Sequence, residues 1–146
     1  MKPLELTDDL ITGIDDIDDQ HRELFKWANE VASDEAMADD GKFFEAVANL
    51  QEYVKYHFRA EKDAMEIYDF GGLEKHTSQH KRLIWEVEEL YERSKREGAS
   101  KGLKIELQYM FADWIVLHIK EWDKAFAAFM KSNDLTAVPL PDVYSF

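Results

Sequence analysis

Two pairs of polar side chains near the middle of the chain have a spacing suited to metal binding. His57 precedes Glu61 by four residues, and His76 precedes His80 by four residues. Residues four apart lie on one face of an α-helix, so each pair can direct two ligand atoms to one point. Three of the five histidines fall between residues 56 and 80. Imidazole and carboxylate bind first-row transition metals, so this concentration of histidine predicts metal chemistry.

Both pairs interrupt hydrophobic stripes that repeat every three or four residues, the period of an amphipathic α-helix. The pattern predicts helices over about 43–65 and 73–94, a first helix that follows the aspartates at 15–19, and a fourth from about Leu103 to about Lys131. His21 lies on the inner stripe of the first helix. The predicted inner positions of the fourth are Leu107, Met110, Trp114, Ile115, His118, Trp122, Ala125 and Phe129.

The segments between and beyond these helices contain breaking residues. Residues 1–14 predict an extended arm, residues 33–41 a break, and residues 132–146, with two prolines, a short tail whose apolar side chains include Leu140, Val143, Tyr144 and Phe146. Asp18 is interpreted as one of the acidic residues that start the first helix. We expect an all-α protein: an antiparallel up-down-up-down four-helix bundle in a single domain, with arm 1–14, bundle about 15–131 and tail 132–146.

Composition narrows the possible partners. The 146 residues include 18 basic and 31 acidic side chains, a net charge of −13 that repels nucleic acid and anionic membrane surfaces. The absence of cysteine excludes disulfides, iron–sulfur clusters and thiolate zinc sites. The acidic amino terminus does not resemble a secretory signal, and no apolar run reaches membrane length. We expect a soluble cytoplasmic protein that is a monomer.

All five histidines fall on predicted inner stripes of four different helices. One HxxxH pair or one buried histidine is more often ordinary packing, but five inward imidazoles with a carboxylate are difficult to satisfy by hydrogen bonds alone. Five imidazoles also exceed the needs of one tetrahedral zinc, so two metals are implied. The zinc hydrolase motif HExxH is absent, and so is the Glu-x-x-His of ferritin-like di-iron proteins.

Four motifs in sequence order resemble those of the hemerythrin family, in particular its single-domain bacterial members. These are IDxQH at 17–21, HxxxE at 57–61, HxxxH at 76–80 and HxxxxD at 118–123, within a resemblance that covers roughly residues 13–131. The family's arm usually carries a tryptophan where Leu6 stands here, which affects the expected packing of the arm but not the ligands.

The resemblance implies a non-heme di-iron site with an oxo or hydroxo bridge. One iron would be held by His76, His80 and His118, and the other by His21 and His57, with Glu61 and Asp123 bridging. Dioxygen would bind as hydroperoxide at the open position of the iron with two histidines. By the same resemblance, the oxygen pocket would be lined by Leu24, Phe58, Trp114, Ile115 and Ile119, although ordinary core packing would use equally apolar residues.

Asp123 is not predicted by helical periodicity. Five residues turn a regular helix by about 140° beyond one full turn, so His118 and Asp123 do not share a narrow face. Either the carboxylate reaches around the helix or the helix is locally widened, and the alternative is a solvated acid beside Lys124. The resemblance to the family favours the ligand role.

The leading functional hypothesis is reversible oxygen binding for transport, storage or delivery, without enzymatic activity. The oxygen-consuming partner that would receive it is not predicted. Alternatives at the same site are an oxygen or redox sensor, a di-iron enzyme that removes peroxide or nitric oxide, and a protein that buffers iron or zinc.

Overall fold

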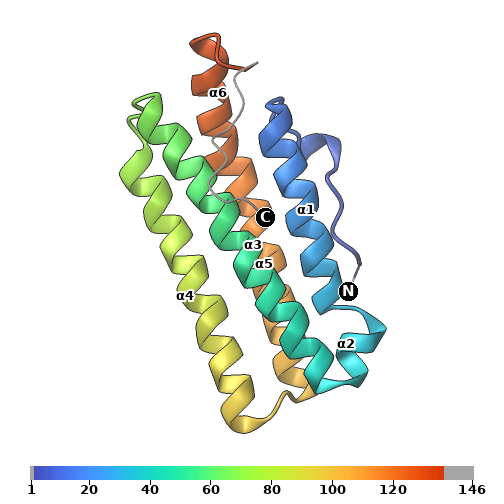
Figure 1. Cartoon of the computed structure of the whole chain (residues 1–146). Helices are drawn as coiled ribbons and strands as arrows, with labels where there is room; N and C mark the ends of the chain where they lie inside the picture. Colours follow the sequence, from blue (N-terminus) through green and yellow to red (C-terminus); the bar gives the residue numbers. More distant parts are fainter. Residues whose placement is uncertain (1, 137–146) are drawn as a thin grey trace.

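The computed structural model describes residues 2–136 and contains four long helical rods (Figure 1). They are α1 (Asp15–Val31), α3 (Asp40–Ile67), α4 (Leu73–Glu97) and a fourth rod made of α5 (Lys101–His118), a π-helical segment (Ile119–Asp123) and α6 (Lys124–Ser132). Consecutive rods run in opposite directions (Figure 1), α1 packs on α3 and α5, and α4 packs on α3 and α5. The predicted all-α four-helix bundle is confirmed, and residues 2–136 contain no strand.

The predicted arm lies against α1 and is not wholly extended. It contains one 3₁₀ turn, Asp8–Leu10. The amide of Leu4 donates to the side-chain oxygen of Asn29 at 2.8 Å, and the Asn29 amide donates to the Leu4 carbonyl at 3.0 Å. Leu6 is half-buried against the core. The last ten residues, including Leu140, Val143, Tyr144 and Phe146, lie outside the described residues.

Asp18 lies in the first turn of α1, as predicted, and its carboxylate binds the end of the arm. The residue that precedes α1 is Ile14, and Asp18 is only 4% exposed. Its Oδ1 accepts hydrogen bonds from the amide and the hydroxyl of Thr12 at 2.9 and 2.8 Å, and its Oδ2 accepts from the amide of Gly13 at 3.1 Å. Gly13 has φ +86°, a backbone conformation that residues other than glycine rarely adopt. Asp18 therefore fixes the turn between the arm and α1.

The predicted break at 33–41 contains a short helix, α2 (Asp34–Ala38). Ser33 caps it by accepting from the amide of Ala36 at 3.2 Å. Lys104 of α5, only 3% exposed, donates to the carbonyls of Ala36 and Met37, both at 3.0 Å, and pairs with Asp40 at 3.0 Å. A buried ammonium is stable only with such partners, and this one ties the corner between α2 and α3 to the fourth rod.

The π-helical segment changes which residues of the fourth rod face inward. Ala125 was predicted to face the core but is exposed, and Trp122 and Phe129 are only half-buried. A π-helical turn includes one extra residue, so every position after it rotates relative to a regular α-helix. The buried residues after the segment begins are instead Ile119, Asp123, Phe126, Ala127 and Met130.

The helices surround two apolar clusters, one on each side of the buried histidines. The larger cluster includes Leu24, Phe43 and Phe111, and the smaller one includes Met65 and Phe126. Within residues 2–136, no helix combines the length and apolar character needed to cross a membrane.

We expect the Asp18→Ala variant to lose about 2–4 kcal/mol of unfolding free energy, because the amides of Thr12 and Gly13 and the Thr12 hydroxyl would lose a charged acceptor. Urea unfolding followed by circular dichroism measures this loss. The matched control is Asp15→Ala, which removes an exposed carboxylate from the same helix. Equal stability of the two variants would contradict the role of Asp18.

Candidate metal centre

The seven side chains predicted as metal ligands come together between the two apolar clusters. Each is at most 3% exposed. Their ligand atoms form two groups, and within each group all of these atoms lie within 4.8 Å of one another. The first group contains His76 and His80 of α4 and His118 of α5, the second contains His21 of α1 and His57 of α3, and both contain the carboxylates of Glu61 and Asp123.

The Glu61 carboxylate lies between the two groups. Its Oε1 is 2.7 Å from Nε2 of His57 and 3.8 Å from Nε2 of His21. Its Oε2 is 3.1 Å from Nε2 of His76 and 3.4 Å from Nε2 of His80. One oxygen therefore faces the group with two histidines, and the other faces the group with three.

The two oxygens of the Asp123 carboxylate also face different groups of histidines. Its Oδ2 is 2.9 Å from Nε2 of His21, while its Oδ1 is 2.9 Å from Nε2 of His76 and 3.2 Å from Nε2 of His118. The π-helical segment makes this possible, because its wider turn brings the carboxylate to the same side of the rod as His118. Of the two possibilities left open by the sequence, the structure shows local widening of the helix.

Four of these atoms approach their neighbours without the directions required for a hydrogen bond. They are Nε2 of His21, Nε2 of His57, Oε1 of Glu61 and Oδ2 of Asp123, and each lacks a hydrogen-bond partner within the described residues. All four belong to the group with two histidines. Buried polar atoms without partners are costly, and a cation placed among them would satisfy all four. Imidazole and carboxylate ligands suit a first-row transition metal, so the residues fit such an ion.

The carboxylates are held in their ionised form. Burial by itself raises the pKa of Glu61, but His57, His21 and His76 outweigh it and hold this pKa well below the ordinary range. Burial and the charge of Glu61 both raise the pKa of Asp123, and His118 and His21 again bring it below its ordinary range. Two negative charges are therefore available at the centre of the bundle.

The pKa values of three of the histidines are shifted in opposite directions by their surroundings. Burial lowers the pKa of His21 and His76, but the carboxylates of Asp123 and Glu61 close to these rings more than offset it, and raise these pKa values to about 9 and about 10. For His80, burial dominates over Glu61 and is reinforced by the charges of His118 and His76, so its pKa falls to about 4. Without a metal ion, the raised pKa values keep His21 and His76 protonated at neutral pH beside the two carboxylates.

Gln20 orients one ligand, and sequence reasoning did not predict this role. Nδ1 of His57 donates to Oε1 of Gln20 at 2.6 Å, which leaves Nε2 of the same ring facing Glu61. A hydrogen bond on one ring nitrogen fixes which nitrogen is free to bind a metal. The available signal was the position of Gln20 directly before His21, in the IDxQH motif.

The five residues predicted to line an oxygen pocket belong to the larger apolar cluster or pack against it. Leu24, Ile115 and Ile119 are fully buried. Phe58 stacks on the ring of His80, with centroids 3.8 Å apart, and half-buried Trp114 stacks on His118 at 4.4 Å. Two of the five therefore contact the group with three histidines, and oxygen binding by these residues remains a prediction.

Fold and site together define a four-helix-bundle protein with a buried histidine and carboxylate centre able to hold metal ions. The profile of the Hemerythrin HHE cation binding domain family matches residues 12–130. The chain therefore belongs to the hemerythrin HHE family, as its motifs indicated.

Individual relatives agree with this assignment. The chain is 30% identical to a bacteriohemerythrin of Clostridium acetobutylicum, over 82% of this chain and 95% of the relative. It is 29% identical to a bacteriohemerythrin of Stenotrophomonas maltophilia, over 86% and 80% of the two chains. A crystal structure of a mutant protein, 22% identical, aligns with a TM-score of 0.77 over 88% of this chain and 97% of the other, and shows the same fold.

We expect metal binding to depend on which group loses a ligand. Glu61→Ala removes a carboxylate shared by both groups and should lower the amount of metal bound in each group. His57→Ala should lower mainly the amount of metal bound in the group with two histidines. Metal analysis of the purified variants measures both. Glu92→Ala, an exposed change on α4, is the control and should bind metal normally. Equal metal loss in all three variants would refute the assignment.

Metal loading should release protons at neutral pH. His21 and His76 are protonated below their raised pKa values, and a metal ligand must be deprotonated. Metal affinity should therefore increase as the pH rises from 6 to 8. Calorimetric titration of metal-free protein in two buffers of different ionisation enthalpy counts the released protons. An affinity independent of pH, with no proton release, would contradict the charge state described here.

Proposed function

We propose that the protein holds two iron ions and binds dioxygen reversibly, for transport, storage or delivery in the cytosol. The observation that carries the proposal is the orientation of the two carboxylates: each group of histidines faces one oxygen of Glu61 and one oxygen of Asp123. A carboxylate with this placement can bridge two cations. Membership of the hemerythrin HHE family and the curated bacteriohemerythrin relatives support iron as the metal.

The two proposed iron positions differ in how many protein ligands they have. His76, His80 and His118 supply three imidazoles to one, together with the bridging carboxylates, while His21 and His57 supply two to the other. The second position therefore retains room for a small molecule, and open coordination is what makes a metal site reactive. A ferrous pair, with an oxo or hydroxo bridge in its oxidised form, would supply the electrons that reversible oxygen binding requires.

The protein's own contribution is to hold the ligands and to exclude water. Leu24 lies one turn after His21, Ile119 follows His118, and both side chains are fully buried. An apolar environment slows the entry of water and protons, which favours release of unchanged oxygen over its reduction. We therefore propose a binding protein and not an enzyme.

Reversible binding is tested by adding ferrous iron to the protein without air and then admitting oxygen. A visible absorption band should form with oxygen and disappear when oxygen is removed, through repeated cycles. Steady consumption of peroxide or nitric oxide beyond one reaction per site would instead support an enzyme. A protein that binds iron but shows no reversible band would refute the proposal.

A second variant tests the role of the apolar environment. Leu24→Ser should retain iron but lose the oxygen-dependent band faster than the unchanged protein, because a hydroxyl beside His21 admits water. Leu107→Ser is the matched control, since it makes the same change at a side chain 1% exposed and three turns from His118. If both variants lose the band at the same rate, the environment of His21 has no special role.

A further inference from the structure

We propose that the groove between α3 and α4 binds a small organic oxyanion, a carboxylate or phosphate attached to a compact apolar body. The groove encloses about 310 Å³ and is lined by eight residues from these two helices. The proposal does not depend on oxygen binding, because the cationic side chains of the groove lie outside the metal centre.

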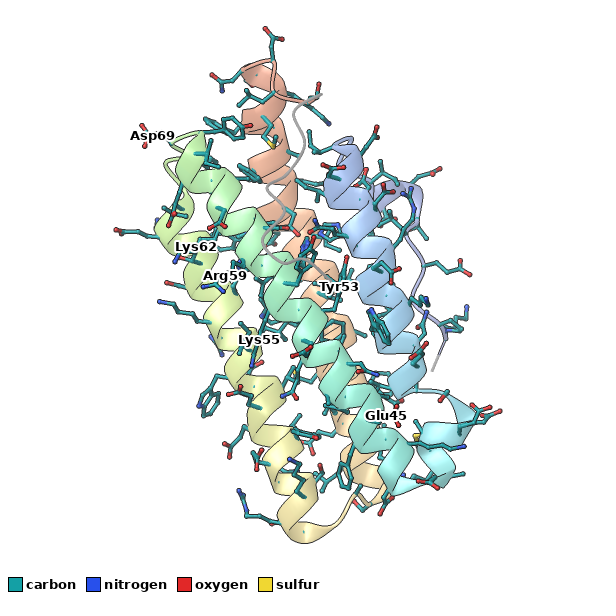
Figure 2. All side chains as sticks on the ribbon, viewed as in Figure 1. Glu45, Tyr53, Lys55, Arg59, Lys62 and Asp69 are labelled. Atoms are coloured by element: carbon teal, nitrogen blue, oxygen red, sulfur yellow. The ribbon has the colours of Figure 1, made fainter. Side chains whose placement is uncertain are left out.

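The charge of the lining is opposite to that of the whole chain. Four of the eight lining residues are cationic and none is acidic, in a protein with a net charge of −13. Lys55, Arg59 and Lys62 follow one another along the side of α3 that faces α4 (Figure 2). Lys81 of α4 also lines the groove. A multiply charged oxyanion between the two helices could therefore contact cations on both sides.

The partners of Lys55 and Lys62 leave these two side chains able to bind a ligand. Lys55 pairs with Glu88 at 3.4 Å and Lys62 with Glu66 at 3.9 Å, and all four side chains are about half exposed. Ion pairs between exposed side chains are weak, so an oxyanion can compete with them. Lys81 has no ion pair within residues 2–136.

The negative net charge does not cancel this local field. At physiological ionic strength exposed charges are screened beyond about 8 Å, so a ligand in the groove responds mainly to nearby charges: the four cations of the lining and the carboxylates of Glu66 and Glu88. Repulsion by the rest of the chain lowers the rate of encounter with anions more than it weakens contacts once they are made.

The floor of the groove is apolar, which distinguishes it from a site for a simple inorganic ion. Phe58 and Ile84 contribute to the floor, and the hydroxyl of Thr77 already donates to the carbonyl of Leu73 at 2.9 Å. A phosphate ion makes no use of such a surface, whereas an aromatic or short aliphatic body can cover it. The combination of apolar floor and cationic sides selects an anion with an apolar part.

The groove also reaches the edge of the metal centre. Its floor includes the edge of His80, and Phe58 stacks on this ring at 3.8 Å with the planes 1° apart. A bound anion would therefore lie next to His80, a proposed iron ligand.

The test is equilibrium dialysis of the metal-loaded protein with naphthalene-2-sulfonate, an aromatic oxyanion with low affinity for iron. We expect saturable binding of one molecule per chain, weaker at high salt, and displaced by 2-naphthoate or 2-naphthyl phosphate. The neutral naphthalene-2-sulfonamide should bind at least about tenfold more weakly, since it cannot form charge-assisted hydrogen bonds.

Two variants identify the site. The double variant Lys62→Gln/Lys81→Gln removes one cation from each side and should weaken binding by at least about tenfold. Lys95→Gln/Lys101→Gln removes the same charge near the opposite end of α4 and should bind the probe normally. Ile84→Ser should weaken binding of the naphthalene probe while leaving weak phosphate binding unchanged.

The outcomes are distinct from those of the oxygen experiment. Loss of probe binding in the groove variant alone would support the site, whether or not the protein binds oxygen. Equal affinity in the groove variant and its control, or no saturable binding at all, would overturn it. An affinity unaffected by Ile84→Ser would overturn the assignment to an organic anion. Circular dichroism of each variant verifies that the bundle is folded.

Discussion

The burial of two carboxylates at the centre of the bundle is the constraint on which the rest of the structure depends. Glu61 and Asp123 are both fully inaccessible to solvent. An isolated buried carboxylate would cost several kcal/mol, so each requires compensating partners at close range. The partners are imidazoles supplied by α1, α3, α4 and the fourth rod. Every rod contributes to the same cluster, which ties the relative positions of the four rods to the chemistry of the site.

The π-helical segment reconciles the geometry of a helix with this requirement. A regular helix would direct Asp123 away from His118, and the extra residue in the wider turn brings both to one side. The same extra residue rotates the end of the rod, so that Phe126 and Met130 face Ile17 in the smaller apolar cluster. The π-helical segment thus allows both the contact of Asp123 with His118 and the packing of Phe126 and Met130 in the smaller apolar cluster.

The surroundings of the two groups of histidines differ in character. In the group with three, the rings of His80 and His118 are covered by Phe58 and Trp114 through stacked contacts. In the group with two, His57 is oriented by a hydrogen bond to Gln20, and four ligand atoms have no hydrogen-bond partner among residues 2–136. The first group is enclosed by aromatic rings, and the second offers the greater unsatisfied capacity to bind. This asymmetry agrees with the proposal that small molecules bind on the side of His21 and His57.

The sequence by itself determined the helices of the bundle and the seven residues that meet at its centre. Helical periodicity is a local property, so it identified inward positions such as His57 and His76, and the motif resemblance added Asp123, which periodicity could not. Tertiary structure alone decided how the carboxylate oxygens are divided between the groups, because that depends on the packing of four separate helices. It also decided the partners of Asp18 and Lys104. The carbonyl of Ala36 that Lys104 contacts lies 68 residues earlier in the chain, and no local pattern records a contact at that separation. The inward positions after His118 were predicted from the period of a regular α-helix, which the extra residue of the π-helical turn changes.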